Sequence, residues 1–329
     1  MNEPTADPAE PSLGGLIQER EGLFRRIRRR LPPVAGAPAR WPAAARLLAG
    51  AFLLGLVALP ACAGELAPYR ALYHLSLVSA KSGSGVVAAG GAVLDEWGET
   101  CDGWTEQERF LMRLQYAEQG DEKIRSNLVS WEAKNGLRYR FTERRETKGE
   151  DGQRPSGDDD ESQAAAGAGV QEIRGEARLD GSDKPGIATF TRPEATTLSL
   201  PAGALFPTAH TLLLIARAQA GDQMVTRKLF DGSDLATAAQ VTAFIGPPQA
   251  PGKTGADIPS LAQAALLDRP SWRIRLAFFP AASVNGLPDY EETIRLFDNG
   301  VVGEMLFDYG DYVIRAKLDD IEALPRPAC

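Results

Sequence analysis

Few residues could carry out catalysis, and their spacing does not match a catalytic motif. The chain has 329 residues and two histidines, His74 and His210. A serine triad would need one of them as the base beside an activated nucleophile. Ser84 stands between two glycines without the Gly-x-Ser-x-Gly pattern of a nucleophile elbow, which favours a flexible turn. His210 falls in the first turn of a predicted helix, where a structural role is commoner than proton transfer. Hydrolysis is therefore the least favoured function.

No metal or cofactor site is predicted either. The three cysteines form no Cys-x-x-Cys pair, and two histidines are too few for an ordinary zinc site. The acidic run Asp158–Glu161 lacks the central glycine and terminal glutamate of a calcium-binding loop, so a solvated acidic loop is the preferred interpretation. The strand and helix patterns do not form a dinucleotide-binding unit.

An export signal is predicted near the beginning of the chain. Leu47–Pro60 is apolar, Arg40 and Arg46 precede it, and the small residues Ala61 to Ala63 follow it. The run is shorter than the roughly 20 residues of a membrane-spanning helix. We expect cleavage after Ala63, so that residues 1–63 are leader and signal. The alternative is a lipoprotein signal in which Cys62 is lipidated and retained.

The charge balance disfavours nucleic acid as a partner. The whole chain carries a net charge of −8. Residues 1–63 contain 8 arginines and 5 acidic residues, a net charge of +3, so residues 64–329 carry −8 − 3 = −11. An acidic protein of this kind repels phosphate backbones and anionic lipid headgroups.

Two cysteines, Cys101 and Cys329, remain after the predicted cleavage. An even number of cysteines in an exported protein favours a disulfide, although two free thiols stay possible. A bridge between them would join an early strand region to the last residue. The closed loop would be long enough to contribute roughly 5 kcal/mol to stability.

Alternating apolar and polar residues predict a β-rich fold. The pattern recurs along most of residues 64–329, and it predicts about a dozen strands that are mostly antiparallel. Residues 143–170 are charged or small, which predicts a flexible loop. Asn299-Gly300 predicts the turn of a hairpin between 293–297 and 301–307.

One convincing helix interrupts this pattern within residues 200–222. Pro207 and Thr208 are helix start signals, and Gly221 is a stop signal. The predicted apolar stripe of this helix consists of Ala209, Leu212, Leu213 and Ala216. Leu214 and Ile215 widen the apolar surface beyond that stripe, so a curved sheet is expected to cover the helix on more than one side.

The combination of motifs resembles the EipB family of periplasmic cell-envelope integrity proteins. The resemblance rests on four segments and on the positions of the two cysteines. The segments are Ala67–Tyr73 (APYRALY), Leu205–Thr211 (LFPTAHT), Asp231–Asp234 (DGSD) and Asp308–Tyr312 (DYGDY). It implies a strongly curved, spiral-like antiparallel sheet wrapped around one main helix. It also implies a disulfide between Cys101 and Cys329 and a single periplasmic domain over residues 64–329.

For function, the resemblance implies a non-enzymatic protein that supports the envelope under stress. The preferred role is binding of an envelope protein, and a periplasmic tetratricopeptide-repeat protein is the partner that the resemblance suggests. The alternative is a carrier of lipid or another apolar molecule. A carrier would need a cavity on the concave face, and its candidate lining is Phe110, Met112, Leu114, Trp272 and Phe278. These residues could instead pack the helix, as apolar strand faces usually do.

Overall fold

One curved sheet and one main helix make up the described part of the chain. The computed structural model describes residues 66–118, 120–149, 169–252, 265–279 and 286–329. Among these residues, fifteen strands form a single sheet. In chain order the elements are β1 (Tyr69–Ala80), β2 (Val86–Glu99), β3 (Gly103–Tyr116), β4 (Gly120–Ala133), β5 (Arg138–Gly149), β6 (Gly169–Leu179), β7 (Gly186–Arg192), β8 (Thr196–Leu200), β9 (Ala204–Leu205), α1 (Pro207–Gln219), β10 (Met224–Leu229), β11 (Ala239–Ile245), β12 (Ser271–Phe279), β13 (Tyr290–Phe297), β14 (Val302–Asp308) and β15 (Tyr312–Ala323).

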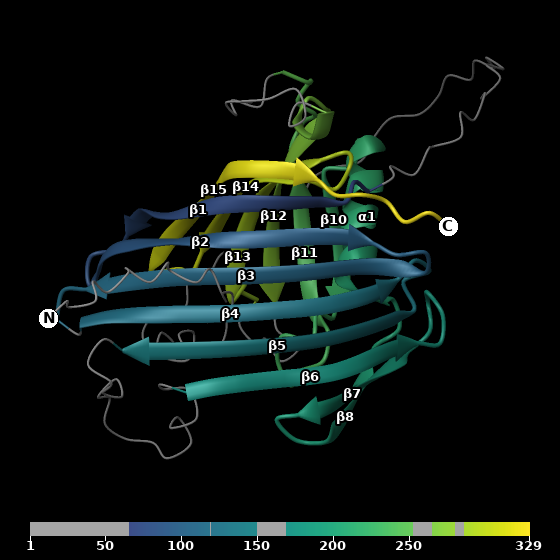
Figure 1. The fold of residues 1–329 in the computed structure, drawn as a ribbon, viewed down its shortest axis with the longest axis horizontal. Coiled ribbons are helices and arrows are strands. Elements are labelled where there is room, and N and C mark those ends of the chain that lie inside the picture. Colours follow the sequence, from purple (N-terminus) through teal and green to yellow (C-terminus); the bar gives the residue numbers. More distant parts are fainter. Residues whose placement is uncertain (1–65, 119, 150–168, 253–264, 280–285) are drawn as a thin grey trace, which may run out of the picture.

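The order of the strands makes the sheet curl until its edges approach each other. Strands β1 to β8 follow one another to one edge, and β15 back to β9 follow one another from β1 to the other edge. All neighbours are antiparallel except β9 and β10. The two edge strands β8 and β9 are consecutive in the chain and are separated only by residues 201–203. Four backbone steps from Leu200 to Ala204 span at most about 14 Å. The long strands β1 to β6 therefore cross the front of the molecule, and β10 to β13 and α1 lie behind them (Figure 1). The predicted strongly curved, spiral-like sheet wrapped around one helix is confirmed.

The apolar faces of the strands point into the curl and form three buried clusters. The largest joins β1, β3, β14 and β15 and includes Tyr73, Leu75 and Ile314. A second packs α1 against β10 to β13. The third joins the two edges of the sheet, because Phe141 and Phe190 from one half contact Phe230 from the other.

The helix begins and ends where the sequence predicts. Pro207 is its first residue, and Gly221 follows it in a left-handed conformation with φ +83°. Its buried face differs from the predicted stripe. Leu214, Ile215 and Ala218 are buried, whereas Ala216 of that stripe is exposed. Leu214, Ile215 and Ala218 pack against β10 to β13, so the side of the helix that faces these strands is the buried one, and it differs from the predicted stripe. No helix among the described residues is long and apolar enough to cross a membrane.

The structure also tests the predicted disulfide and the predicted bounds of the acidic loop. Cys101, in the turn between β2 and β3, is bonded to Cys329 with an S–S distance of 2.07 Å, so the predicted disulfide is confirmed. The predicted loop 143–170 is too long at both ends, because β5 continues to Gly149 and β6 begins at Gly169. Glu143 explains the first extension, since its buried carboxylate accepts a hydrogen bond from Ser126 on β4. Residues 150–168, Cys62 and the predicted cleavage site at Ala63 lie outside the described residues.

Candidate functional site

The five residues predicted to line an apolar pocket all point into the curl of the sheet. Phe110, Met112 and Leu114 of β3 are at most 2% exposed and belong to the largest cluster. Trp272 of β12 belongs instead to the cluster around α1. Phe278 is half-buried and contacts both clusters, and its ring lies 5.3 Å from that of Tyr290. The structure thus places the five on one inner surface but divides them between two packed clusters.

Carboxylates interrupt this apolar inner surface, which the sequence analysis did not anticipate. Asp95 on β2 lies opposite Glu108 on β3, and Glu106 lies two residues further along β3 on the same inner face. The Tyr69 hydroxyl donates a hydrogen bond of 3.1 Å to Oδ2 of Asp95. Ser130 donates one of 3.4 Å to Glu106. The sequence contains a signal for them, because these acids alternate in step with Val93, Phe110 and Met112, which are buried in the core.

The surrounding interior holds these acids closer to neutrality than water would. Burial raises the pKa of Glu106 to about 7, and the hydrogen bond from Ser130 limits that rise. Burial also raises the pKa of Glu143 to about 7, against the charge of Arg145. Burial and the charge of Glu106 raise the pKa of Asp95 well above its usual value. A charged carboxylate loses hydration inside a protein, so part of this acidic layer binds protons near neutral pH.

A further buried acid, Glu132 at the end of β4, positions the helix. Phe206 at the helix start has no side chain that could accept hydrogen bonds from the free backbone N–H groups. Glu132 accepts them instead, at 2.7 Å from the N–H of Thr208 and 2.8 Å from that of Ala209. Burial raises the pKa of Glu132 to about 7, and these two bonds limit the rise. The positive end of the helix dipole favours the ionised carboxylate.

The two histidines lie in different surroundings. His74 is exposed on the outer face of β1, and His210 is 5% exposed in the first turn of α1. Burial and the charge of Arg227 lower the pKa of His210 to about 4. His210 therefore stays neutral at physiological pH. Among the described residues, no group of three or more histidine, cysteine, aspartate or glutamate side chains is arranged to hold a metal ion.

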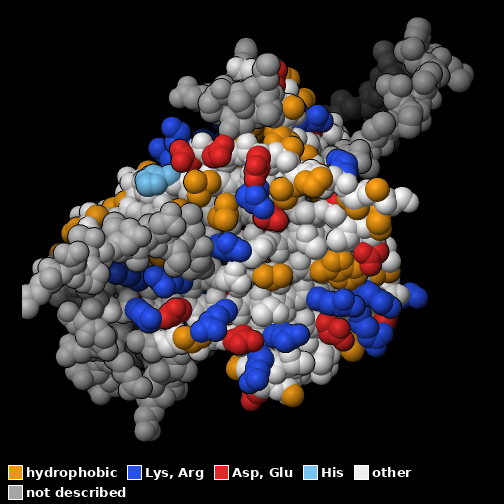
Figure 2. Space-filling model, in the orientation of Figure 1, with side chains coloured by type: hydrophobic (Ala, Val, Ile, Leu, Met, Phe, Trp, Pro, Cys, Tyr) orange, Lys and Arg blue, Asp and Glu red, His pale blue; other side chains and the backbone are white. Residues whose placement is uncertain are grey.

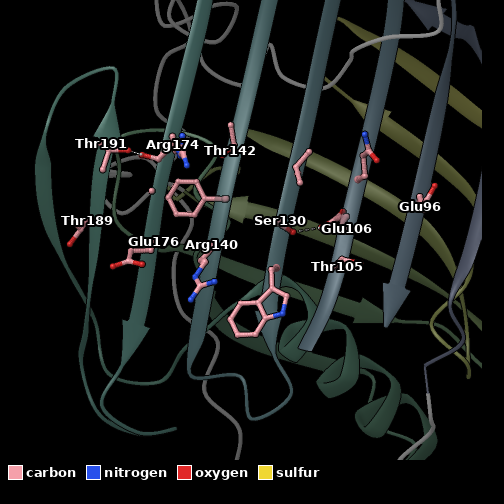
Figure 3. A pocket seen from close by; sticks show the side chains of 15 residues that line it. Glu96, Thr105, Glu106, Ser130, Arg140, Thr142, Arg174, Glu176, Thr189 and Thr191 are labelled. Atoms are coloured by element: carbon pink, nitrogen blue, oxygen red, sulfur yellow. Dashed lines mark hydrogen bonds between the residues drawn. The ribbon is translucent and has the colours of Figure 1, made fainter. Parts of the chain in front are cut away.

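A groove of about 560 Å³ runs across the outer face of the sheet from β2 to β7. Two cross-strand rows of directly opposed residues with outward side chains form most of it, and the row between them, Glu106, Ser130, Phe141 and Gly175, completes the lining. The first row consists of Thr105, Trp131, Arg140, Glu176 and Thr189. The second row consists of Glu96, Gln107, Val129, Thr142 and Arg174, and Thr191 lies beside it. Figure 3 shows that Arg140, Glu176 and Thr189 lie side by side on three adjacent strands. None of the five residues predicted to line a pocket belongs to this groove.

Most of the residues that line the groove carry a hydroxyl, amide or charged group, and Val129, Trp131 and Phe141 add apolar surface. Arg140 is exposed, and its guanidinium lies over the Trp131 ring at 5.1 Å from the ring centre. Glu96 is already paired with Arg70 at 2.8 Å. The planar guanidinium stacked on an indole keeps its N–H groups available to a ligand at the ring edge. Neither histidine lines the groove, and its composition is that of a binding surface for polar molecules.

Comparison with known proteins agrees with this fold. A family model described as EipB-like matches residues 60–170 and 160–325. The cell envelope integrity protein EipB of Brucella abortus (strain 2308) is 29% identical over 261 residues, which cover 78% of this chain and 84% of that protein. The crystal structure of a β-barrel-like protein of domain of unknown function DUF1849 from Brucella abortus matches with a TM-score of 0.67. That match has 26% identity and covers 80% of this chain and all of the other. Because the family model spans most of the described fold, the chain belongs to the EipB-like family.

Proposed function

We propose that this chain is a non-enzymatic, extracytoplasmic protein that supports the integrity of the cell envelope by binding an envelope protein. The observation that carries the proposal is the similarity to the Brucella protein, which is named for envelope integrity and matches over 84% of its length. The disulfide between Cys101 and Cys329 supports an oxidising compartment. A cleavable signal ending at Ala63 would deliver residues 64–329 to the periplasm.

The separation of the potential catalytic groups supports a binding role. His74 lies exposed on β1, and His210 is buried in α1 with its pKa lowered to about 4. A hydrolase of the serine type needs a histidine base within hydrogen-bond reach of its nucleophile. The groove on β2 to β7 offers hydroxyl, amide and guanidinium groups for recognition.

The test is crosslinking in intact cells, followed by identification of the captured proteins. Photoreactive side chains would be placed on the outer face of the sheet in one set of variants and at buried inner positions in a control set. We expect the outer set to capture one defined envelope protein, of which a tetratricopeptide-repeat protein is the first candidate. If both sets capture the same abundant proteins, also under envelope stress, the proposed protein partner is wrong.

A second candidate function is transport of a lipid or another apolar molecule inside the curled sheet. The observation in its favour is that Leu128 and Phe278 face inward yet stay half-buried. The packed clusters around Phe110 and Trp272 therefore do not cover the inner surface completely. Mass spectrometry of protein purified from membranes would detect a bound lipid. A native sample identical in mass to a delipidated one would reject this function.

A further inference from the structure

The half of the sheet that carries the groove places several arginines on its outer face. Arg138 lies directly opposite Arg178, and Arg174 lies directly opposite Arg192. Like charges at directly opposed positions of an antiparallel pair destabilise it. Arg178 is 3.4 Å from Asp180. Among the described residues, Arg138, Arg174 and Arg192 form no ion pair. Figure 2 shows many Lys and Arg side chains on this part of the face, with Asp and Glu side chains among them. The sheet thus accepts an electrostatic cost next to the groove.

Three arginines on the other half of the same sheet have acidic partners. Arg273 on β12 is 3.2 Å from Glu304 on β14, and Arg315 on β15 is 3.3 Å from the same carboxylate. Arg275 is paired with Glu291. These three arginines are exposed like those near the groove, yet each has an acidic partner one or two strands away. On the same half, Arg295 of β13 lies directly opposite Arg273 and bonds to Gln249 and not to an acid, so arginines without an acidic partner among the described residues occur on both halves. What distinguishes β5 and β6 is that two arginines, Arg140 and Arg174, line the groove itself.

We propose that the outer groove binds an anionic glycan, which is a sugar polymer that carries carboxylate or phosphate groups. Arg140 and Arg174 lie within the groove and would bind these groups with bidentate hydrogen bonds. Arg138 and Arg192 flank it and would attract the polymer. The inference goes beyond the envelope function proposed above and does not depend on it.

The lining of the groove favours a glycan over an acidic polypeptide. Hydroxyl and amide groups lie beside the arginines and suit a ligand that is covered with hydroxyl groups. They belong to Thr105, Gln107, Thr142, Thr189 and Thr191. Trp131 offers a flat apolar ring on which a sugar could stack. An extended peptide commonly binds by adding a strand to a free edge of a sheet. This groove crosses the middle of β3 to β6, where both neighbours of each strand are already paired.

The same lining argues against a membrane surface as the occupant. A protein that lies on a bilayer inserts a substantial apolar face between the headgroups. Within the groove, the large exposed aliphatic side chain is Val129, which is 45% exposed. The remaining exposed groups of the lining, such as Arg140, Glu176 and Thr191, are polar. Anionic headgroups could attract the arginines, but the apolar contact that holds such a protein in place is small.

The test measures binding of a fluorescent alginate oligosaccharide, a carboxylated glycan, to the purified protein at physiological salt. The double variant Arg140→Gln/Arg174→Gln is expected to weaken binding at least about tenfold, since arginine to carboxylate bonds are about twice as strong as neutral ones. The matched control Arg273→Gln/Arg275→Gln changes the net charge equally on the other half of the sheet. We expect it to change affinity by less than about twofold, because exposed charges at that distance are screened. Trp131→Ala should weaken binding about two- to fivefold without changing the charge.

Three results would overturn the inference. An equal loss in both double variants would mean that only net charge attracts the glycan. Tighter binding of poly-L-glutamate, or of vesicles containing phosphatidylglycerol, than of alginate would identify an acidic polypeptide or a membrane as the occupant. Absence of binding to alginate and to a phosphorylated glycan would reject a glycan site. Thermal unfolding of each variant checks that it is folded. None of these outcomes bears on the crosslinking test of the envelope function.

Discussion

The hydrogen bonds between Glu132 and the start of α1 give a sharp test of how the helix is held inside the sheet. Glu132 is 2% exposed and accepts the backbone N–H groups of Thr208 and Ala209. A buried donor left without a partner costs about 1 to 3 kcal/mol. Glu132→Ala removes both acceptors, so we expect it to lower the free energy of unfolding by about 4 kcal/mol. That is a large part of the roughly 5 to 15 kcal/mol by which an ordinary protein is stable.

The isosteric variant Glu132→Gln separates the hydrogen bonds from the packing. Its amide oxygen still accepts one N–H while its amide nitrogen faces the other, so the expected loss is about 2 kcal/mol. Urea unfolding followed by circular dichroism measures both losses, and the slope with denaturant should stay unchanged. Glu172→Ala, on the exposed face of β6, is the control and should cost less than about 0.5 kcal/mol. If Glu132→Ala and Glu172→Ala cost the same, the helix is not anchored by this carboxylate.

Three further predictions follow from the disulfide, the inner acids and the aromatic cluster. Reduction of the Cys101–Cys329 bond, which closes a separation of 228 residues, should lower the free energy of unfolding by about 5 kcal/mol. A thermal melt with and without dithiothreitol measures it, and a double Cys→Ser variant that still responds to the reductant would contradict it. Burial raises the pKa of Glu106 from 4.5 to about 7. Between these pH values the folded state keeps a proton that the unfolded state releases, so the free energy of unfolding falls as the pH rises from about 4.5 to about 7. Glu106→Gln should therefore be more stable than the parent by up to about 3 kcal/mol at pH 8 and equal to it near pH 4, and equal stability at both pH values would refute the assignment. Phe141→Ala should cost about 3 to 5 kcal/mol, because Phe141 contacts Phe190 and Phe230 across the two edges of the sheet, and calorimetry would compare it with the exposed Phe244→Ala.

Local patterns in the sequence predict most of the strands and the bounds of the helix. Alternation around Tyr73 and Leu75 needs only the geometry of a single strand to be interpreted. Pro207 and Gly221 act through their own backbone conformations, so the helix starts and ends as expected. The buried side of the helix was predicted wrongly at Ala216, because the direction from which the sheet covers a helix is set by residues far away in the chain.

The groove depends on information that local patterns do not contain. Trp131, Arg140 and Glu176 become neighbours only through the register of β4, β5 and β6. A shift of one residue in either pairing would move these side chains to the inner face. The inner acids could have been found, because Glu106 and Glu108 keep step with Phe110 along one strand. The apolar pattern of β3 was easier to recognise than the acids within it.

The distribution of charge across the sheet wall qualifies what net charge predicts about partners. The chain carries −8 overall, which predicts repulsion of anionic molecules. Part of that negative charge belongs to the inward-facing Glu106 and Glu143, where burial raises the pKa of each to about 7. The outer face of the same strands presents Arg140 and Arg174 to solvent. An approaching polymer responds to charges within about 8 Å at physiological ionic strength and is screened from the rest. A local arginine surface can therefore bind an anion although the whole protein is acidic, and only the register of the strands reveals which sign each face presents.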